Sequence, residues 1–171
     1  MDVFDILVSN GIDINHQDKC GLTILMVVCV CYPHIDMIQK ILDSGAKIDI
    51  KSSTRNTALH FLSKNEIGHM ILDRLCCYGR LEFINSINNN GSTPLMMDAS
   101  KHNFKLVEKL ISCGADCNLI NNETKTALMC ASKFSYDIDH ENIDIVLLRY
   151  RRASLPNPHF FVPILRFFLF L

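Results

Sequence analysis

The sequence predicts an all-α fold, a solenoid of stacked helix-turn-helix units joined by short loops. The first observation is a threonine that stands two residues before a leucine, at Thr23, Thr57, Thr93 and Thr126. The second is a glycine that recurs out of phase with the threonine, at Gly11, Gly45, Gly79 and Gly114. The threonines are separated by 34, 36 and 33 residues, and the glycines by 34, 34 and 35. A fixed period of about 33 residues with two short helices per unit indicates repeats that bury their apolar faces only against their neighbours.

The composition fits one globular domain or a short array of smaller units. Of the 171 residues, 49% are hydrophobic and 20% are charged, which is enough apolar material for a core and too little charge for a disordered chain. The formal net charge is -1. This balance gives no electrostatic reason to expect binding to nucleic acid or to an anionic membrane surface.

The N-terminal segment lacks the features of a secretion signal. Asp2 and Asp5 interrupt it, no basic stretch precedes it, and no small-residue cleavage site follows it. We therefore expect an intracellular protein whose eight cysteines are reduced and mostly buried. No run of 18 apolar residues occurs, so no helix is expected to span a membrane.

Each unit carries start and stop signals for its two helices. Thr23 is the expected N-cap of the apolar segment at 23–31, and Tyr32-Pro33 is its expected end. In the third unit, proline follows the threonine and is preorganised for the first helical turn. Second helices are expected to end at the recurring glycine, which adopts the left-handed conformation. The Asn-rich segments at 87–92 and 120–124 supply turn residues for the loops between units.

These segments resemble the ankyrin repeat, in which G-x-T-P-L-H opens a first helix and L-L-x-x-G-A-x-x-N closes a second one. The opening pattern stands here as GLTILM (21–26), NTALH (56–60), GSTPLMMDAS (91–100) and KTALMCAS (125–132). The closing pattern stands as ILDSGAKID (41–49) and LISCGADCN (110–118). The resemblance extends from Phe4 to Val146 and implies an all-α ankyrin-repeat solenoid of stacked helix-turn-helix units with short finger loops. The imperfect copies look like those of a poxvirus or intracellular-bacterial ankyrin protein.

The repeats divide the chain into six predicted segments. They are an opening half-repeat at 1–16, ankyrin repeat 1 at 17–50, repeat 2 at 51–86, repeat 3 at 87–119, a degenerate repeat 4 at 120–152 and an apolar non-repeat tail at 153–171. Repeat 4 also carries an insertion at 134–142 between its helices. Because loops lie on the surface, this insertion is a further candidate for partner contact.

Three features depart from the repeat pattern. Arg55 stands where the repeat opens with glycine. Asp98 stands where the family places a small buried alanine. We expect Asp98 to tilt out to solvent or to accept hydrogen bonds, because a buried unpaired carboxylate costs several kcal/mol. The first helix of repeat 1 is apolar on nearly every side, so either both its faces are covered or it exposes an apolar patch.

The tail at 153–171 is rich in Phe and Leu, whereas repeat arrays normally end in a polar cap. It has three alternative interpretations. It folds back as a cap on the last repeat, it is the out-of-frame or truncated end of a longer protein, or it contacts a membrane surface or a partner. Leu155-Pro156 also loosely resembles the start of an F-box, which implies an adaptor that recruits a ubiquitin ligase.

No catalytic or metal-binding motif is found. The sequence has no G-x-S-x-G, Walker, H-E-x-x-H or G-x-G-x-x-G motif, so we expect no enzyme, no cofactor and no metal site. The pairs Cys29 with Cys31 and Cys113 with Cys117 lack the spacing of a zinc site and are expected to pack as small apolar side chains. The resemblance implies that His60 hydrogen-bonds the backbone of a neighbouring loop.

The resemblance implies a protein-protein interaction module. In ankyrin arrays, finger loops and first helices form a concave surface where partner proteins dock. The corresponding finger-tip candidates for partner binding are Lys51, Ser52, Ser53, Thr54, Arg55, Asn88, Asn89, Asn90, Asn121, Asn122 and Glu123. The alternative is that these residues only form turns. We expect a monomer that binds an unidentified protein in the cytoplasm, which is the host cytoplasm if the chain is a viral or bacterial effector.

Overall fold

The structure is a computed structural model of the 171-residue chain, and it describes residues 3–31, 34–62, 68–78 and 83–131. The insertion at 134–142 and the tail at 153–171 lie outside these ranges, so the predictions made for them stay predictions. Apart from a 3₁₀ assignment at Phe83, every helix assigned in the described ranges is an α-helix, and no strand is assigned there, which confirms the predicted fold class.

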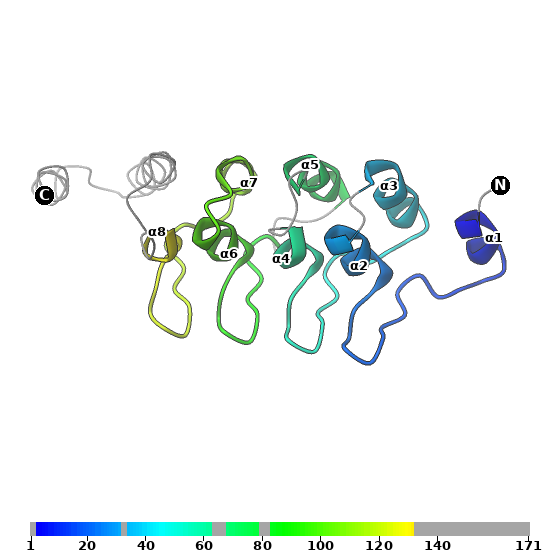
Figure 1. Cartoon of the computed structure of the whole chain (residues 1–171), viewed down its shortest axis with the longest axis horizontal. Helices are drawn as coiled ribbons and strands as arrows, with labels where there is room; N and C mark the ends of the chain where they lie inside the picture. Colours follow the sequence, from blue (N-terminus) through cyan, green and yellow to red (C-terminus); the bar gives the residue numbers. More distant parts are fainter. Residues whose placement is uncertain (1–2, 32–33, 63–67, 79–82, 132–171) are drawn as a thin grey trace, which may run out of the picture.

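The helices alternate between two rows (Figure 1). The first helices of the repeats form one row: α2 (Ile24–Cys31), α4 (Ala58–Leu62), α6 (Pro94–Ser100) and α8 (Ala127–Ala131). The second helices of repeats 1 to 3 form the other row: α3 (Ile35–Asp43), α5 (Gly68–Tyr78) and α7 (Phe104–Ser112). The helix of the opening half-repeat, α1 (Val3–Ser9), lies apart from this row at the N-terminal end of the array. Long loops project from the first-helix row away from the second helices. Each first helix from α2 to α8 packs against the next one along the row.

The predicted threonine caps start three of the first helices. Thr93 is the N-cap of α6, and its side-chain oxygen accepts a hydrogen bond from the Met96 amide, with Pro94 in the first turn. The hydroxyls of Thr23 and Thr126 accept equivalent bonds from amides three residues onward, both at 3.4 Å. A threonine side chain thereby satisfies an amide that has no partner within its helix.

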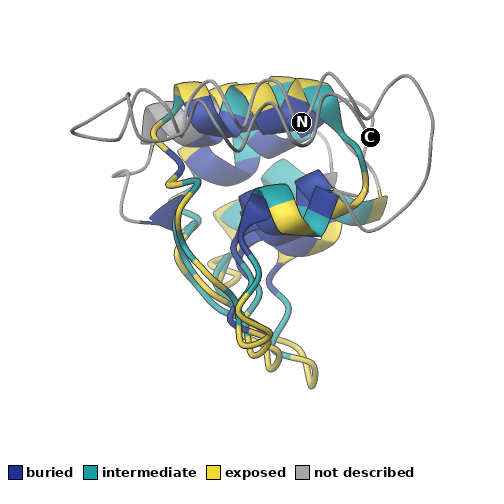
Figure 2. Ribbon diagram, turned by 90° about the vertical axis from the view of Figure 1, so that its left-hand side faces the viewer, coloured by how far each residue is buried: buried dark blue, intermediate teal, exposed yellow. Residues whose placement is uncertain are grey.

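The core lies between the two rows (Figure 2), and its buried side chains form one cluster from Leu25 in α2 to Ala131 in α8. The second helix α7 shows how a helix of this row contributes to the core. It buries Leu106, Val107, Leu110 and Ile111, which recur with helical spacing and form one apolar face. A second helix therefore turns a single face inward, whereas a first helix is packed between two neighbours and the second-helix row.

The apolar first helix of repeat 1 is covered on one side only. In α2, Leu25 and Cys29 are buried, while Ile24 and Val27 are 41% and 39% exposed. The sequence left open whether this helix is covered on both faces or exposes an apolar patch. The exposed Ile24 and Val27 side chains show that it exposes one. Burial raises the pKa of the Cys29 thiol to about 12, so this thiol stays protonated and unreactive.

The prediction that the cysteines are mostly buried is wrong for the six cysteines whose side chains the structure describes. Of these six, Cys29 alone is fully buried. Cys20 is exposed because it lies at a loop tip, and Cys31 is exposed at the last position of α2. Cys113, Cys117 and Cys130 are partly exposed. The short helices leave few fully enclosed positions, and large aliphatic side chains occupy most of them.

The prediction that Asp98 tilts out to solvent or accepts hydrogen bonds is wrong in both alternatives. Its side chain is neither tilted to solvent nor hydrogen-bonded, because it is 0% exposed in α6 and no described residue donates a hydrogen bond to either carboxylate oxygen. Burial raises the pKa of Asp98 well above its usual range, although Lys101 opposes the effect. A buried carboxyl group without a donor is stable in the folded state only when it is protonated.

We predict that Asp98→Ala stabilises the protein at pH 7 by ~1–3 kcal/mol, because it removes a desolvated polar group. The raised pKa means that the folded state holds a proton that the unfolded chain releases above pH ~4. The wild-type free energy of unfolding should therefore fall as the pH rises from 4 to 7. Urea titrations followed by circular dichroism, on both proteins at several pH values, measure this difference.

If Asp98→Ala unfolds at the same or a lower urea concentration than the wild type throughout this pH range, the carboxyl group has a compensating partner. Asp98→Asn is the matched control. It keeps a buried polar group of the same size without a titratable proton, so it should remove the pH dependence and recover little stability.

Candidate functional site

The loops between repeats share one turn, and we call them fingers 1 to 4, at residues 16–22, 50–56, 86–92 and 119–125. At the third residue of each finger, the backbone amide donates to the carbonyl four residues onward, at 2.9–3.1 Å. These third residues are Asp18, Ser52, Asn88 and Asn121. The side-chain oxygen of each accepts a bond from one or two amides of the same turn. Short polar side chains at this position therefore close the finger.

Neighbouring fingers are joined by backbone hydrogen bonds. The Ser53 amide donates to the Cys20 carbonyl, the Asn89 amide to the Thr54 carbonyl, and the Asn122 amide to the Asn90 carbonyl, each at 3.0 Å. Side chains add to this ladder, since Asn88 Nδ2 donates to Asn56 Oδ1 at 3.0 Å. The fingers thus form one connected surface along the array (Figure 1).

The sixth residue of each finger has a left-handed backbone. The φ angles are 71° at Gly21, 61° at Arg55, 70° at Gly91 and 58° at Thr124. Glycine adopts this conformation without strain, whereas a residue with a Cβ does not. At Gly21 an added Cβ would lie 2.7 Å from the Ser53 nitrogen, so this finger is also pressed against the next one. Arg55 and Thr124 hold side chains at a position that glycine suits better.

His60 links two repeats, as the resemblance implied. Its Nδ1 accepts a hydrogen bond from the Thr57 amide at 3.1 Å, which places the ring proton on Nε2. Nε2 then donates to the Ser92 carbonyl in finger 3 at 3.1 Å. The side chain is 1% exposed, and burial lowers the pKa of His60 to about 4. The neutral ring therefore fixes the position of finger 3 relative to α4 at neutral pH.

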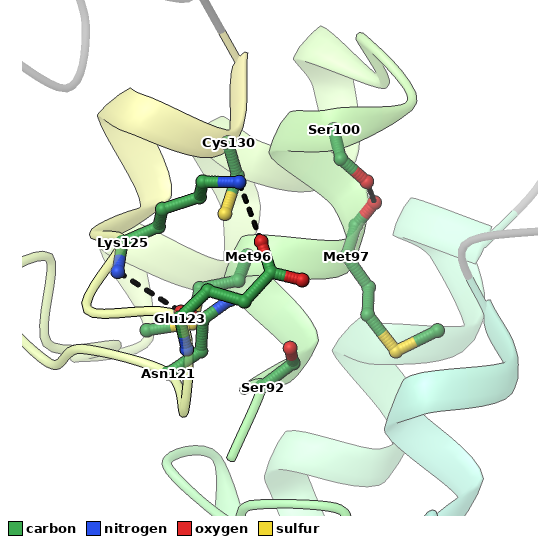
Figure 3. Close-up of a pocket in the computed structure, with 8 residues that line it drawn as sticks. All are labelled: Ser92, Met96, Met97, Ser100, Asn121, Glu123, Lys125 and Cys130. Carbon is green, nitrogen blue, oxygen red and sulfur yellow. Dashed lines mark hydrogen bonds and ion pairs between the residues drawn. The ribbon is translucent and has the colours of Figure 1, made fainter. Parts of the chain in front are cut away.

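An apolar residue recurs four positions after each threonine, and we call this set the apolar stripe: Val27, Phe61, Met97 and Cys130. None of the four side chains is fully buried. Met97 and Cys130 line a pocket of about 190 Å³ together with residues of finger 4 (Figure 3). Asn88 Nδ2 of finger 3 lies 3.7 Å from Met97 Sδ. The stripe thus lies on the side of the first helices that the fingers flank.

Charged and polar groups surround the Met97 pocket. Lys125 donates to Glu123 across the finger 4 turn at 2.5 Å, and Ser92 and Ser100 complete the lining (Figure 3). The pocket is too small for a drug-sized molecule, for which cavities measure ~300–1,000 Å³. Its size and its mixed lining suit one side chain of another protein.

The other end of the stripe opens into a wider hollow. Val27 and Ile24 line this hollow together with Leu7 and Ile12, next to finger 1. Its volume is about 520 Å³, and most of its lining is apolar. Leu7 and Ile12 are also exposed large hydrophobic residues. Apolar side chains of the stripe therefore line a hollow at each end of the described array.

The structure separates the predicted finger residues into two groups. Ser52, Asn88 and Asn121 are turn residues whose side-chain oxygens are already bonded within their fingers. The remaining candidates are Lys51, Ser53, Thr54, Arg55, Asn89, Asn90, Asn122 and Glu123. Lys51 is half-buried and the other seven are exposed. Their role in partner binding stays a prediction.

Sequence analysis missed the apolar stripe. The signal was present, because each member stands four residues after a recurring threonine, but the residue type changes from Val to Phe to Met to Cys. Among the described residues, no three His, Cys, Asp or Glu side chains gather in a way that could hold a metal ion. In the same ranges, no helix combines the length and the apolar character needed to cross a bilayer.

Comparison with known proteins shows which sequences share this pattern. A family model described as ankyrin repeats in three copies matches residues 1–82 and 79–154. A fowlpox virus ankyrin repeat protein is 35% identical over 130 residues, covering 72% of this chain and 36% of the relative. A variola virus ankyrin repeat protein is 29% identical over 131 residues, covering 73% and 23%. The glp-1 protein of Caenorhabditis elegans is 26% identical over 153 residues, covering 84% and 11%. The chain thus spans about a third or less of the length of these relatives.

We predict that the repeats loosen in acid because His60 must gain a proton. Its folded pKa of about 4 lies below the unfolded value near 6.5, so the unfolded state binds more protons between these pH values. Stability is therefore lost as the pH falls through this window, by roughly 3 kcal/mol at most, since one pKa unit corresponds to about 1.4 kcal/mol. His60→Gln should remove this loss.

Asp98 acts in the opposite direction over part of the same window, so the comparison is best made between Asp98→Ala and Asp98→Ala/His60→Gln. Urea titrations at pH 4, 5, 6 and 7 give the difference in slope. Parallel pH profiles for the two variants would show that His60 does not control the acid sensitivity.

Proposed function

The chain belongs to the ankyrin-repeat family, and on this basis we propose that it is a non-enzymatic module that binds a partner protein through the apolar stripe and the flanking fingers. Ankyrin repeats mediate protein-protein interaction as a family. The observation that carries the proposal for this chain is the stripe itself. Four partly exposed apolar side chains, one per repeat, lie beside fingers whose turn-forming groups are already hydrogen-bonded.

The physical chemistry of the stripe supports a protein partner. Interface cores are enriched in aromatic residues and methionine, and the stripe contains Phe61 and Met97. Each of these side chains loses contact with water when a partner covers it, which is favourable by ~25 cal/mol for each Å² of apolar area. The fingers supply a polar rim through exposed side chains such as Asn89, Asn122 and Glu123. An apolar strip with a polar rim is the arrangement of a typical interface.

The partner we propose is a protein of a host cell, met in the cytoplasm. Two of the relatives are ankyrin repeat proteins of poxviruses, which supports an interaction with host proteins. We further propose that the chain acts as a monomer, since a long, open concave surface needs no second copy to bind a partner.

We predict that Met97→Glu weakens partner binding at least roughly tenfold, because it brings a charge into a contact that excludes water. The matched control is Met70→Glu, which makes the same change on α5 in the other helix row, where Met70 is 45% exposed. Affinity capture from host-cell lysate, read by mass spectrometry, compares both variants with the wild type. Proteins captured by the wild type and by Met70→Glu should be lost with Met97→Glu.

Equal capture by all three proteins would move the binding surface away from the stripe. Circular dichroism of each variant shows whether it is folded, so that a loss of capture is not confused with unfolding.

The adaptor and fragment alternatives concern residues 153–171. A 1–152 truncation tests both in the same capture experiment. Loss of a ubiquitin-ligase component, with the other partners retained, would support the adaptor.

We predict that the truncation keeps its helical circular dichroism spectrum. A cooperative loss of helicity would instead show that the tail caps the array.

A further inference from the structure

Finger 2 carries a local positive charge on a nearly neutral chain. Residues 50–56 contain Lys51 and Arg55 and no acidic residue. Arg55 is exposed and Lys51 is half-buried. In the described part of the structure, neither side chain forms a hydrogen bond or an ion pair. Their charge is therefore available to another molecule.

The neighbouring fingers do not neutralise the positive charge of finger 2. Finger 3 has no charged residue between 86 and 92. Finger 1 has one acidic and one basic residue, Asp18 and Lys19, which balance each other. The Asp18 carboxylate is also engaged in its own turn, where Oδ1 accepts bonds from the Cys20 and Leu22 amides at 2.8 Å. Finger 2 is thus a cationic projection between fingers of no net charge.

The backbone at Arg55 is unfavourable for the residue that occupies it. Its φ is 61°, and the equivalent residues in fingers 1 and 3 are glycines with φ of 71° and 70°. Thr124 in finger 4 is strained in the same way, but its hydroxyl donates to the Glu123 carbonyl at 2.6 Å. Arg55 has no such bond within the described chain. The side chain therefore brings strain without an intramolecular contact in return, and strained residues of this kind cluster at functional sites.

We propose that Arg55 and Lys51 bind a carboxylate-bearing segment of the partner protein, with Arg55 as the main contact. This inference rests on the proposed function and names the chemistry of the partner. A guanidinium group can donate two parallel hydrogen bonds to a carboxylate, and Lys51, four residues earlier in the same finger, adds a second positive charge. Phe61 of the apolar stripe lies in the same repeat, so the segment has acidic residues next to an apolar side chain.

A protein carboxylate fits this site better than a nucleic acid does. Binding to a nucleic-acid backbone depends on many phosphate contacts along a basic surface. This chain has a net charge of -1, and finger 2 offers only two cations, Lys51 and Arg55. Two cations on one projection match one or two carboxylates.

The test is selection of a random-peptide display library on the full-length chain, followed by affinity measurements with the enriched peptides. We expect Asp or Glu residues to be enriched next to an apolar residue. Arg55→Gln keeps the strained Cβ and removes the charge, so it should weaken binding at least roughly tenfold at an unchanged Tm. Arg55→Lys keeps the positive charge but loses the planar guanidinium group that donates two parallel hydrogen bonds, so it should recover part of the affinity.

Arg55→Gly separates function from stability. It removes the strain and should raise the Tm by about 4 °C, yet it should weaken peptide binding as much as Arg55→Gln does. The matched control is Thr124→Gly at the equivalent position of finger 4, which makes the same backbone change without removing a charge. It should weaken peptide binding less than Arg55→Gly does.

Three outcomes distinguish this inference from the proposed function. Acidic peptides that depend on Arg55 support both. Peptides that lack acidic residues, or that ignore Arg55→Gln while being lost with Met97→Glu, overturn the inference and keep the proposed function. No enrichment, or binding that ignores both variants, overturns both.

Discussion

No repeat of this protein can bury its apolar side chains alone, and the rest of the structure depends on that constraint. The helices α4 and α8 have five residues each, and α6 has seven. Isolated helices of this length are unstable in water. They persist here because each first helix packs against its neighbours along the row and against the second helices. The backbone bonds between fingers, at 3.0 Å, hold the same stacking register from the opposite end of each repeat.

The stacking register turns distant residues into a surface. Val27, Phe61, Met97 and Cys130 are separated by 33 to 36 residues in the sequence, yet they occupy equivalent places on successive first helices. Positions buried by the stack hold side chains such as Leu25 and Leu59, whereas the position four residues after the threonine faces the fingers. A partner that spans several repeats therefore meets one apolar strip, with its polar rim supplied by loops that the stack itself holds in place.

Two buried polar side chains affect the stability of the stack in different ways. His60 is enclosed but has partners on both ring nitrogens, one in its own repeat and one in the next. It strengthens the stack as long as it is neutral. Asp98 is enclosed in α6 without a hydrogen-bond donor among the described residues, so it weakens the stack whenever it is ionised. The pH dependence of the two groups is opposite because burial disfavours the charged form of each, which is the protonated form of His60 and the deprotonated form of Asp98.

The sequence by itself determined the repeat period, the helical fold and the threonine caps, and its resemblance to the ankyrin repeat implied the bridging role of His60. The first three features depend on contacts within one repeat or on a pattern repeated four times. Only the tertiary structure decided that Ser52, Asn88 and Asn121 close turns, that Asp98 has no donor, and that one column of apolar residues stays uncovered. The turn bonds of Ser52, Asn88 and Asn121 are local, but the sequence alone did not separate turn formation from partner binding at these residues. Burial at Asp98 and along the apolar column depends on the neighbouring repeat, which lies more than 30 residues away in the sequence and is adjacent only after stacking.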